Sequence, residues 1–326
     1  MIDNTDNGFT QHGGNMSYIK RNFPNAPQPF IDLSTGVNPY SYPFRQAGEN
    51  HRLADMEEMV VAIRTAADYY GVLPENLTIG SGMQPLLFAL AGLRLQKFGV
   101  SRVAILSPTY SEYKIIWQMA GHKVVEVNNI EELADADVAI ICSPNNPDGK
   151  IYSSEKLEKL RNSWLIVDEA FADVINHHNF SPQGEGIIRM RSIGKFFGLA
   201  GIRVSCAIAS AEITNWLRPV MGSWPITTDA CLMLPAMLKD NAWIEKNRIR
   251  LEQESEDFRD ILAEYFEIVG YTSLFTLARV DNSDSWHTKL AKNGVLVRKF
   301  SYNRNWLRFG LPDKKHIKRI KLALDK

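Results

Sequence analysis

The segment from Arg191 to Ser205 places one lysine among residues that would suit a reactive amine. Lys195 is flanked by glycines and phenylalanines in the sequence RSIGKFFGLAGIRVS, where a solvated surface lysine is not expected. Ser192 comes three positions before Lys195 and Arg203 eight positions after it, so a hydroxyl and a guanidinium accompany the amine. A lone lysine of this kind is usually an ordinary surface residue, so the chemistry depends on its partners elsewhere in the chain.

Several candidate partners follow short apolar runs that are typical of buried strands. LTIG leads into Ser81-Gly82-Met83, RVAILSP into Thr109-Tyr110, DVAIICSP into Asn145-Asn146, and SWLIVDEAF contains Asp168. Each of these residues, taken singly, is explained equally well by a turn or a helix cap. In an open α/β sheet, however, ligands collect at the carboxyl ends of the parallel strands. Together with Lys195, the set predicts one ligand site.

The predicted site meets the requirements of pyridoxal phosphate. This cofactor needs a lysine for its Schiff base, a carboxylate that keeps the ring nitrogen protonated, and anchors for its phosphate. Lys195 and Asp168 would supply the first two, and Asn146 would donate a hydrogen bond to the ring hydroxyl. Backbone N–H groups at a helix start would anchor the phosphate, from Ser81, Gly82 and Met83. The Ser192 hydroxyl and the guanidinium fork of Arg203 would complete the anchor.

Composition and charge narrow the possible partners and compartments. Lys plus Arg and Asp plus Glu balance at 37 each, so the chain has no basic excess that would attract nucleic acid or acidic membranes. No apolar run approaches the roughly 20 residues that span a bilayer, and the polar N-terminus lacks the features of a secretion signal. The three cysteines lack the paired spacing of a zinc site. We therefore expect a cytoplasmic protein that binds no metal, nucleic acid or membrane.

A change of pattern along the 326 residues predicts two domains and an arm. Residues 1–45 are rich in Gly, Asn and Pro and should form an extended arm that packs with the small domain. Residues 46–212 alternate helical periodicity with short β-rich runs, which predicts an α/β domain with a mostly parallel sheet covered on both faces. Residues 213–326 are helix-rich and then turn to short strands, which predicts a smaller α+β C-terminal domain.

The motifs GSGMQ, SPTY, NNPDG, DEAF and SxxKxFGLAGxR occur in this order along nearly the whole chain. In this they resemble the aminotransferase class I/II group of fold-type I pyridoxal phosphate enzymes. The resemblance implies that Lys195 forms the Schiff base, that Asp168 faces the ring nitrogen, that Asn146 contacts the ring oxygen, and that Tyr110 stacks on the ring.

The same resemblance extends to the substrate and to assembly. It implies that Arg308, in WLRFGLP, grips the α-carboxylate of the substrate. Sites of this fold type are usually built at a subunit interface, so we expect a homodimer. One departure is Phe171, because many relatives have there a tyrosine that contacts the ring oxygen. The ring hydroxyl therefore loses one hydrogen-bond donor.

The N-terminal arm carries the motifs that bear on the reaction. HGGN and DLSTGVNPYSYP, as a pair, resemble the threonine-phosphate decarboxylases of cobalamin biosynthesis. In that family L-threonine O-3-phosphate loses carbon dioxide and gives (R)-1-amino-2-propanol O-2-phosphate. The resemblance implies a phosphorylated amino acid as the substrate. Candidate ligands of the substrate phosphate are His12, Gly14, Asn15, Arg21 and Arg298.

Two alternatives remain open. An aminotransferase similar to histidinol-phosphate aminotransferase would use the same cofactor residues and would need 2-oxoglutarate. Relatives of that kind often carry Arg-Tyr-Pro after the arm, with a tyrosine that reaches the partner subunit, whereas this chain has Arg52-Leu53-Ala54. A non-catalytic pyridoxal-binding sensor would carry a DNA-binding helix-turn-helix, and the sequence has no basic N-terminal extension of that type.

Overall fold

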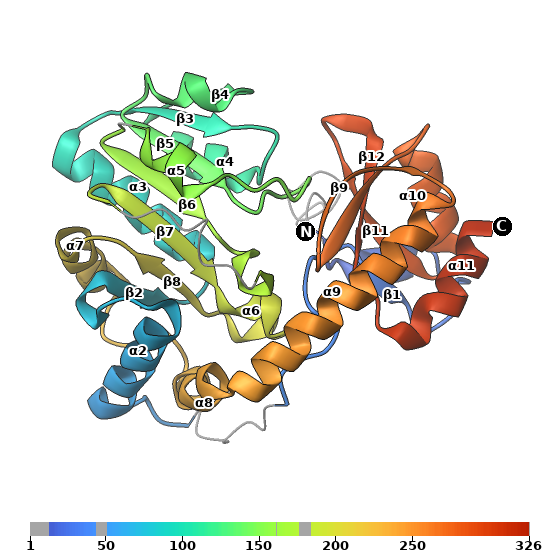
Figure 1. Cartoon of the computed structure of the whole chain (residues 1–326), viewed down its shortest axis with the longest axis horizontal. Helices are drawn as coiled ribbons and strands as arrows, with labels where there is room; N and C mark the ends of the chain where they lie inside the picture. Colours follow the sequence, from blue (N-terminus) through green and yellow to red (C-terminus); the bar gives the residue numbers. More distant parts are fainter. Residues whose placement is uncertain (1–12, 44–50, 161, 176–183, 326) are drawn as a thin grey trace. The chain divides into compact units, whose positions relative to one another are not determined.

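A computed structural model describes residues 13–43, 51–160, 162–175 and 184–325, which divide into two compact units (Figure 1). The larger unit comprises the described parts of residues 41–146 and 150–248. The smaller unit comprises the described residues up to 40, residues 147–149, and those from 249 onward. Helices α7 (Ala211–Met221) and α8 (Thr228–Lys239) thus belong to the larger unit, although the expected division near residue 212 assigned most of them to the small domain.

Within the described residues, the larger unit is built on a seven-stranded sheet. In spatial order its strands are β2 (Leu77–Gly80), β8 (Ser205–Ile208), β7 (Ile187–Ser192), β6 (Trp164–Asp168), β5 (Val138–Cys142), β3 (Arg102–Leu106) and β4 (Lys123–Val127). The strands from β7 to β4 run parallel, while β8 is antiparallel to both of its neighbours. The predicted mostly parallel sheet is confirmed.

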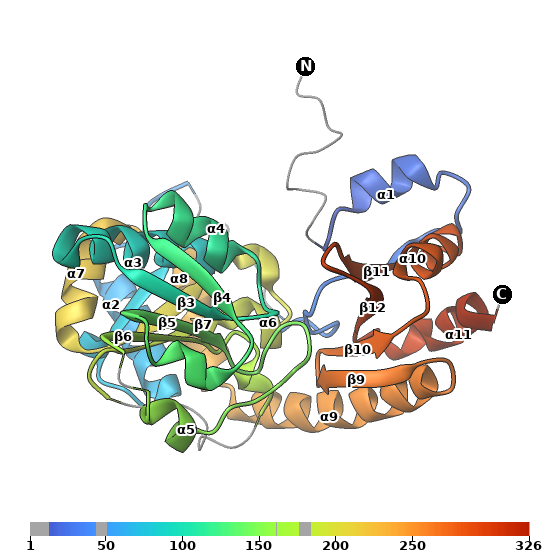
Figure 2. The same cartoon turned by 90° about the horizontal axis from the view of Figure 1, so that it is seen from above.

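Helices cover both faces of this sheet because successive strand residues point to opposite sides. Ile140 belongs to one buried cluster, together with residues of α3 (Met83–Phe98), α4 (Glu112–Met119) and α7. Its neighbour Ile141 belongs to a second cluster, together with Leu157 of α5 (Ser154–Glu158). Figure 2 shows the sheet between α4 and α5. Two cores of this kind are what an apolar parallel sheet requires.

Strand β7 is not among the strands that the apolar runs predicted. Its sequence, IIRMRS, contains Arg189 and Arg191, and yet both arginines are buried. They are accommodated by ion pairs: Arg189 Nε lies 3.0 Å from Glu169 Oε2, and Arg191 Nη2 lies 3.5 Å from Asp173 Oδ1. Buried charges persist where such partners exist. The carboxylates come from a distant part of the sequence, so the strand could not be recognised from its own residues.

The larger unit also contains α2 (Met56–Tyr70), which packs against α8 and begins with a capping box. The Asp55 side chain accepts from the Glu58 N–H, and the Glu58 side chain accepts from the Asp55 N–H. Gly71 ends the helix in the left-handed conformation, at φ 64°.

No helix in the described part of the chain is long and apolar enough to cross a membrane.

The smaller unit has a five-stranded sheet among its described residues. In spatial order the strands are β1 (Ile31–Leu33), β11 (Val295–Phe300), β12 (Asn303–Gly310), β10 (Phe275–Arg279) and β9 (Glu267–Thr272). Strand β1 comes from the N-terminal arm and pairs in parallel with β11. Its helices are α1 (Met16–Asn22), α10 (Ser283–Lys292), α11 (Ile317–Asp325) and residues 249–263 of α9 (Asn241–Ala263).

Candidate active site

The residues predicted to hold the cofactor lie at the carboxyl ends of four neighbouring parallel strands. Tyr110 follows β3, Asn146 follows β5, Asp168 ends β6, and Lys195 comes three residues after β7. A cavity of about 160 Å³ lies there, in the position that open α/β sheets use for ligands. Its lining includes these four residues together with Met83, Ser192 and Arg203. The larger unit alone therefore brings together most of the predicted cofactor residues.

Lys195 is carried by a short helix, α6 (Ile193–Phe196). The helix packs so closely that a Cβ on Gly194 would lie 2.9 Å from the Ala200 Cα. The Lys195 amine lies 5.6 Å from the centre of the Phe171 ring. Phe171 is buried and lines the same cavity, so a hydrocarbon ring stands where the resemblance predicted a tyrosine hydroxyl.

The Asp168 carboxylate is buried and has a donor on each oxygen. The Ala170 N–H donates to Oδ1 at 2.8 Å, and the Tyr113 hydroxyl donates to Oδ2. Burial raises the pKa of Asp168, while the Tyr113 and Ala170 hydrogen bonds and the Lys195 charge act in the opposite direction. Tyr113 is a site residue that the sequence analysis missed. The sequence feature that points to Tyr113 is its helical spacing from Ile116 and Trp117, which places all three on the buried face of α4.

The Tyr110 side chain is held at its edge and at its hydroxyl. Its ring meets the Tyr113 ring edge to face, with centroids 5.4 Å apart and an interplanar angle of 82°. Gln84 Nε2 lies 3.4 Å from the Tyr110 hydroxyl and 2.9 Å from a carboxylate oxygen of Glu112. These contacts hold Tyr110 in the cavity lining, as a stacking residue requires.

The phosphate-binding end predicted from the sequence is built around Arg203. It is the one non-glycine residue with positive φ in the described part of the chain, at φ 55°. Such strain persists only where surrounding structure imposes it, and it clusters at functional sites. A Cβ on Gly82 would lie 2.4 Å from Arg203 Nη2, so the two residues can pack together only with glycine at position 82.

Helix α3 begins at Met83, and Gly82 provides no side-chain cap. The N–H groups of its first turn therefore remain available to an anion. Ser81 differs from the expectation, because its hydroxyl donates to the Pro225 carbonyl at 2.5 Å. Neither Ser81 nor Gly82 lines the cavity itself.

The residues present fit pyridoxal phosphate. One cavity presents an amine, a buried carboxylate, a tyrosine ring and an amide, from Lys195, Asp168, Tyr110 and Asn146. The Arg203 guanidinium packs directly on Gly82, where a side chain would displace it. Planar guanidinium groups bind phosphate through two charge-assisted hydrogen bonds.

In the smaller unit, Arg298 and Arg308 lie directly opposite each other on β11 and β12. Arg308 is 6% exposed, and its Nη2 donates to the Ser34 carbonyl at 3.0 Å. Burial, and next the positive charge of Arg298, lower the pKa of Arg308 to about 10. Two cations in facing positions repel each other. The arrangement is therefore suited to an anionic ligand.

The arm meets Arg308 at Ser34, which the sequence analysis did not single out. The Gly14 N–H donates to the Ser34 hydroxyl at 2.8 Å. The Asn15 side chain is used as the cap of α1, where it accepts from the Tyr18 N–H at 3.1 Å. Arg21 lies on α1 and is exposed. His12 lies outside the described residues.

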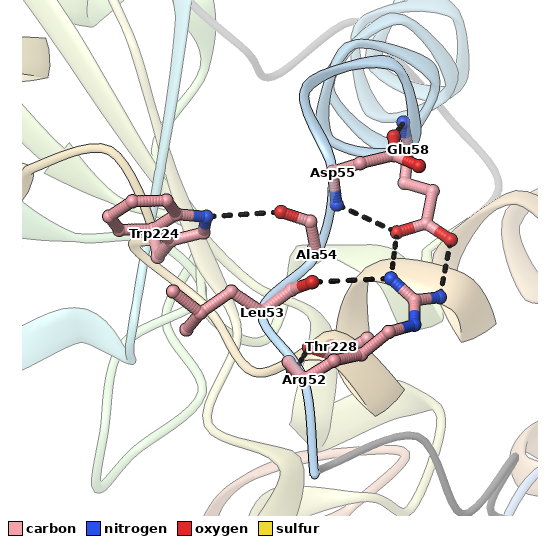
Figure 3. A network of polar contacts seen from close by, with 7 residues as sticks. All are labelled: Arg52, Leu53, Ala54, Asp55, Glu58, Trp224 and Thr228. Carbon is pink, nitrogen blue, oxygen red and sulfur yellow. Dashed lines mark hydrogen bonds and ion pairs between the residues drawn. The ribbon is translucent and has the colours of Figure 1, made fainter.

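Figure 3 shows the segment before α2, where the aminotransferase alternative would place its tyrosine. Thr228 donates to the Arg52 carbonyl at 2.7 Å, and Trp224 Nε1 donates to the Ala54 carbonyl at 3.0 Å. Arg52 also pairs with both oxygens of Glu58, at 2.8 Å and 2.7 Å. Between these anchors, the Leu53 side chain is 61% exposed and offers no hydroxyl.

The fold and the cavity together define a fold-type I pyridoxal phosphate-dependent enzyme. Residues 28–322 match the model of the family described as aminotransferase class I and II. The chain therefore belongs to the class I and II aminotransferase family.

Three similar proteins illustrate the range of activities in this family. A threonine-phosphate decarboxylase from a Sinorhizobium species is 30% identical over 334 residues, covering 96% of this chain and 97% of the relative. Histidinol-phosphate aminotransferase 2 from Archaeoglobus fulgidus is 28% identical, covering 82% and 83%. The crystal structure of histidinol-phosphate aminotransferase from Clostridium acetobutylicum has a TM-score of 0.80 at 22% identity, covering 90% and 98%. The family thus includes decarboxylases and aminotransferases that are similar to this chain.

Proposed function

We propose that the enzyme decarboxylates L-threonine O-3-phosphate to (R)-1-amino-2-propanol O-2-phosphate. The observation that carries this proposal is the facing pair Arg298 and Arg308 in the smaller unit. The proposed substrate has two anionic groups, a carboxylate and a phosphate. An anion beside the pair would relieve the repulsion between the two guanidinium groups and form charge-assisted hydrogen bonds. The 30% identity with a threonine-phosphate decarboxylase, over nearly the whole chain, supports the same assignment.

In this proposal each arginine takes one anionic group. Arg308 would hold the α-carboxylate, since its guanidinium is buried and oriented by the Ser34 carbonyl. Arg298 would hold the phosphate together with the turn at residues 13 and 14. This turn is fixed by the hydrogen bond from the Gly14 N–H to the Ser34 hydroxyl. Holding the substrate by both ends fixes the orientation of the bonds at its Cα. Orientation matters here because it selects the bond that breaks.

Bound pyridoxal phosphate supplies an electron sink for the bond that breaks at the substrate Cα. Asp168 would hold a proton on the ring nitrogen, and its two hydrogen-bond donors fix its carboxylate for that purpose. The Lys195 amine would hold the cofactor covalently until the substrate amine takes its place, and the freed Nζ would then deliver a proton to the Cα from which carbon dioxide has left. Arg203, Ser192 and the start of α3 would hold the cofactor phosphate.

The alternative is an aminotransferase that acts on a phosphorylated amine or amino acid, as the name of the Archaeoglobus relative suggests. The cofactor cavity does not separate the two reactions, because both need the same residues. Leu53 favours the decarboxylase, since it offers no hydroxyl at the position of the tyrosine in that alternative. The arm motifs favour it as well.

Product identification with threonine phosphate, with and without 2-oxoglutarate, tests the proposal. We expect release of carbon dioxide and formation of the phosphorylated amino alcohol without 2-oxoglutarate. Lys195→Ala should abolish the release. Strict dependence on 2-oxoglutarate, or turnover of histidinol phosphate alone, would instead assign the aminotransferase activity.

We also propose that the enzyme acts as a homodimer, as expected for this fold type. Light scattering of the cofactor-loaded protein should give twice the mass of the 36.9 kDa chain. An active monomer would contradict this part of the proposal.

A further inference from the structure

Besides Tyr110, a second tyrosine, Tyr113, contacts Asp168, the carboxylate assigned to the ring nitrogen of the cofactor. The Tyr113 hydroxyl is completely buried and donates to Asp168 Oδ2. Its position is fixed by α4, where Ile116 and Trp117 share the same fully buried face. Tyr113 also lines the cavity, next to Cys142 and Tyr110. A buried hydroxyl normally requires a hydrogen-bond partner, and here that partner is the carboxylate assigned to the ring nitrogen.

We propose that Tyr113 is a positioning residue, which fixes Asp168 as an ionised acceptor and thereby keeps the proton on the pyridine nitrogen of the cofactor. The inference rests on the proposed role of Asp168. It does not depend on whether the enzyme is a decarboxylase or an aminotransferase, because both need an electron-accepting ring.

The charges around Asp168 explain why a donor is needed there. Burial disfavours the ionised carboxylate, and the neighbouring Glu169 carboxylate has the same effect. Three groups favour the ionised form instead: the Tyr113 hydroxyl, the Ala170 N–H and the Lys195 amine. The Ala170 N–H and the Tyr113 hydroxyl are the two of these groups that donate directly to the carboxylate. Of these, Tyr113 is the one that a substitution can remove.

The location of a shared proton depends on the relative basicity of its two acceptors. A hydrogen bond to the charged form stabilises that form. With the Tyr113 donor present, the carboxylate stays ionised and the proton stays on the ring. Without this donor, the carboxylate becomes more basic and the proton shifts toward it. The ring then withdraws electrons less effectively.

The decisive measurement is the ¹⁵N NMR signal of the ring nitrogen in enzyme loaded with ¹⁵N-labelled pyridoxal phosphate. We expect a protonated nitrogen in the natural enzyme and a shift toward the neutral position in Tyr113→Phe. The kcat/KM of this variant should fall about tenfold to a hundredfold, the factor that corresponds to one hydrogen bond to a charged group. Replacement of Tyr113 by 3-fluorotyrosine keeps the shape and strengthens the donor, so the signal should remain protonated.

Two further variants distinguish an error in the inference about Tyr113 from an error in the assignment of Asp168. Tyr70→Phe removes another buried hydroxyl of the larger unit, one that has no hydrogen-bond partner among the described residues, and it should leave the signal unchanged. Asp168→Asn should shift the signal at least as far as Tyr113→Phe. If Asp168→Asn shifts it and Tyr113→Phe does not, the inference about Tyr113 is wrong. If neither variant shifts it, the assignment of Asp168 fails as well.

Discussion

Arg298 and Arg308 occupy facing positions of the antiparallel pair β11 and β12, and the Arg308 guanidinium is almost fully removed from solvent. Like charges in such positions destabilise a sheet. Arg308 donates to the Ser34 carbonyl, and the Gly14 N–H donates to the Ser34 hydroxyl. In the proposed function, a ligand with two anionic groups would offset this repulsion.

Replacing Arg308 with lysine should lower kcat/KM for threonine phosphate about a hundredfold, chiefly through KM. Lysine keeps the charge but lacks the planar fork that binds a carboxylate through two hydrogen bonds. Steady-state kinetics of carbon dioxide release checks this. The matched control is Arg279→Lys, because Arg279 lies on the same sheet, is exposed, and pairs at the surface with Glu267. An equal loss in the control would contradict the assignment of Arg308.

Gly82→Ala should weaken the binding of pyridoxal phosphate at least about tenfold, because the new Cβ would lie 2.4 Å from Arg203 Nη2 and would displace the guanidinium. The positive φ of Gly82, 96°, adds backbone strain. Fluorescence titration of the cofactor-free protein measures the affinity. Gly92→Ala, within α3, serves as the control, since its Cβ would meet no atom within 4 Å. Unchanged affinity in Gly82→Ala would remove Gly82 from the phosphate site.

Borohydride reduction of the loaded enzyme should fix the cofactor on Lys195. The Lys195 amine is the one lysine nitrogen in the lining of the cofactor cavity among the described residues. Peptide mapping by mass spectrometry locates the label. Lys195→Ala should still bind pyridoxal phosphate through the phosphate anchors but should not be labelled. A label on a different lysine of the natural enzyme would overturn the assignment of the whole cavity.

Acidification should destabilise the smaller unit through His287. Burial, and next the charge of Lys299, lower the pKa of His287 from 6.5 to about 4. The unfolded chain therefore binds the proton more tightly, and stability present above pH 6.5 is lost as the pH falls toward 4. The loss amounts to at most about 3 kcal/mol.

Urea denaturation at neutral pH and at acidic pH measures this effect. His287→Gln should lose less stability on acidification than the natural chain. His51→Gln changes an exposed histidine of the larger unit and should behave like the natural chain. Identical acid sensitivity of His287→Gln and the natural chain would show that other groups cause the loss.

Much of the cofactor cavity could be predicted because its residues follow local signals. Asp168 ends an apolar run that forms β6, and Met83 opens the helix after LTIG. The run of motifs places these residues at the carboxyl ends of parallel strands, and parallel strands bring their ends to one edge. For these residues, the order of motifs along the chain was sufficient.

Other parts of the site depend on residues that are distant in the sequence. Strand β7 was missed because its arginines look like surface residues until Glu169 and Asp173 are placed beside them. The sequence around Tyr113 indicates only a buried helix face, and its role follows from the contact of its hydroxyl with Asp168, 55 positions away. Ser34 became relevant only because the fold brings it between Gly14 and Arg308.

The sequence by itself determined the family, the cofactor and the strand ends that carry its residues, because short apolar runs and turns specify strands and their order locally. The tertiary structure alone decided which polar groups meet: Tyr113 with Asp168, Arg203 with Gly82, and Arg298 with Arg308. The physical reason is that hydrogen bonds and charge interactions act over a few ångströms in space. Such distances between remote residues are set by packing and strand register, which no local pattern records.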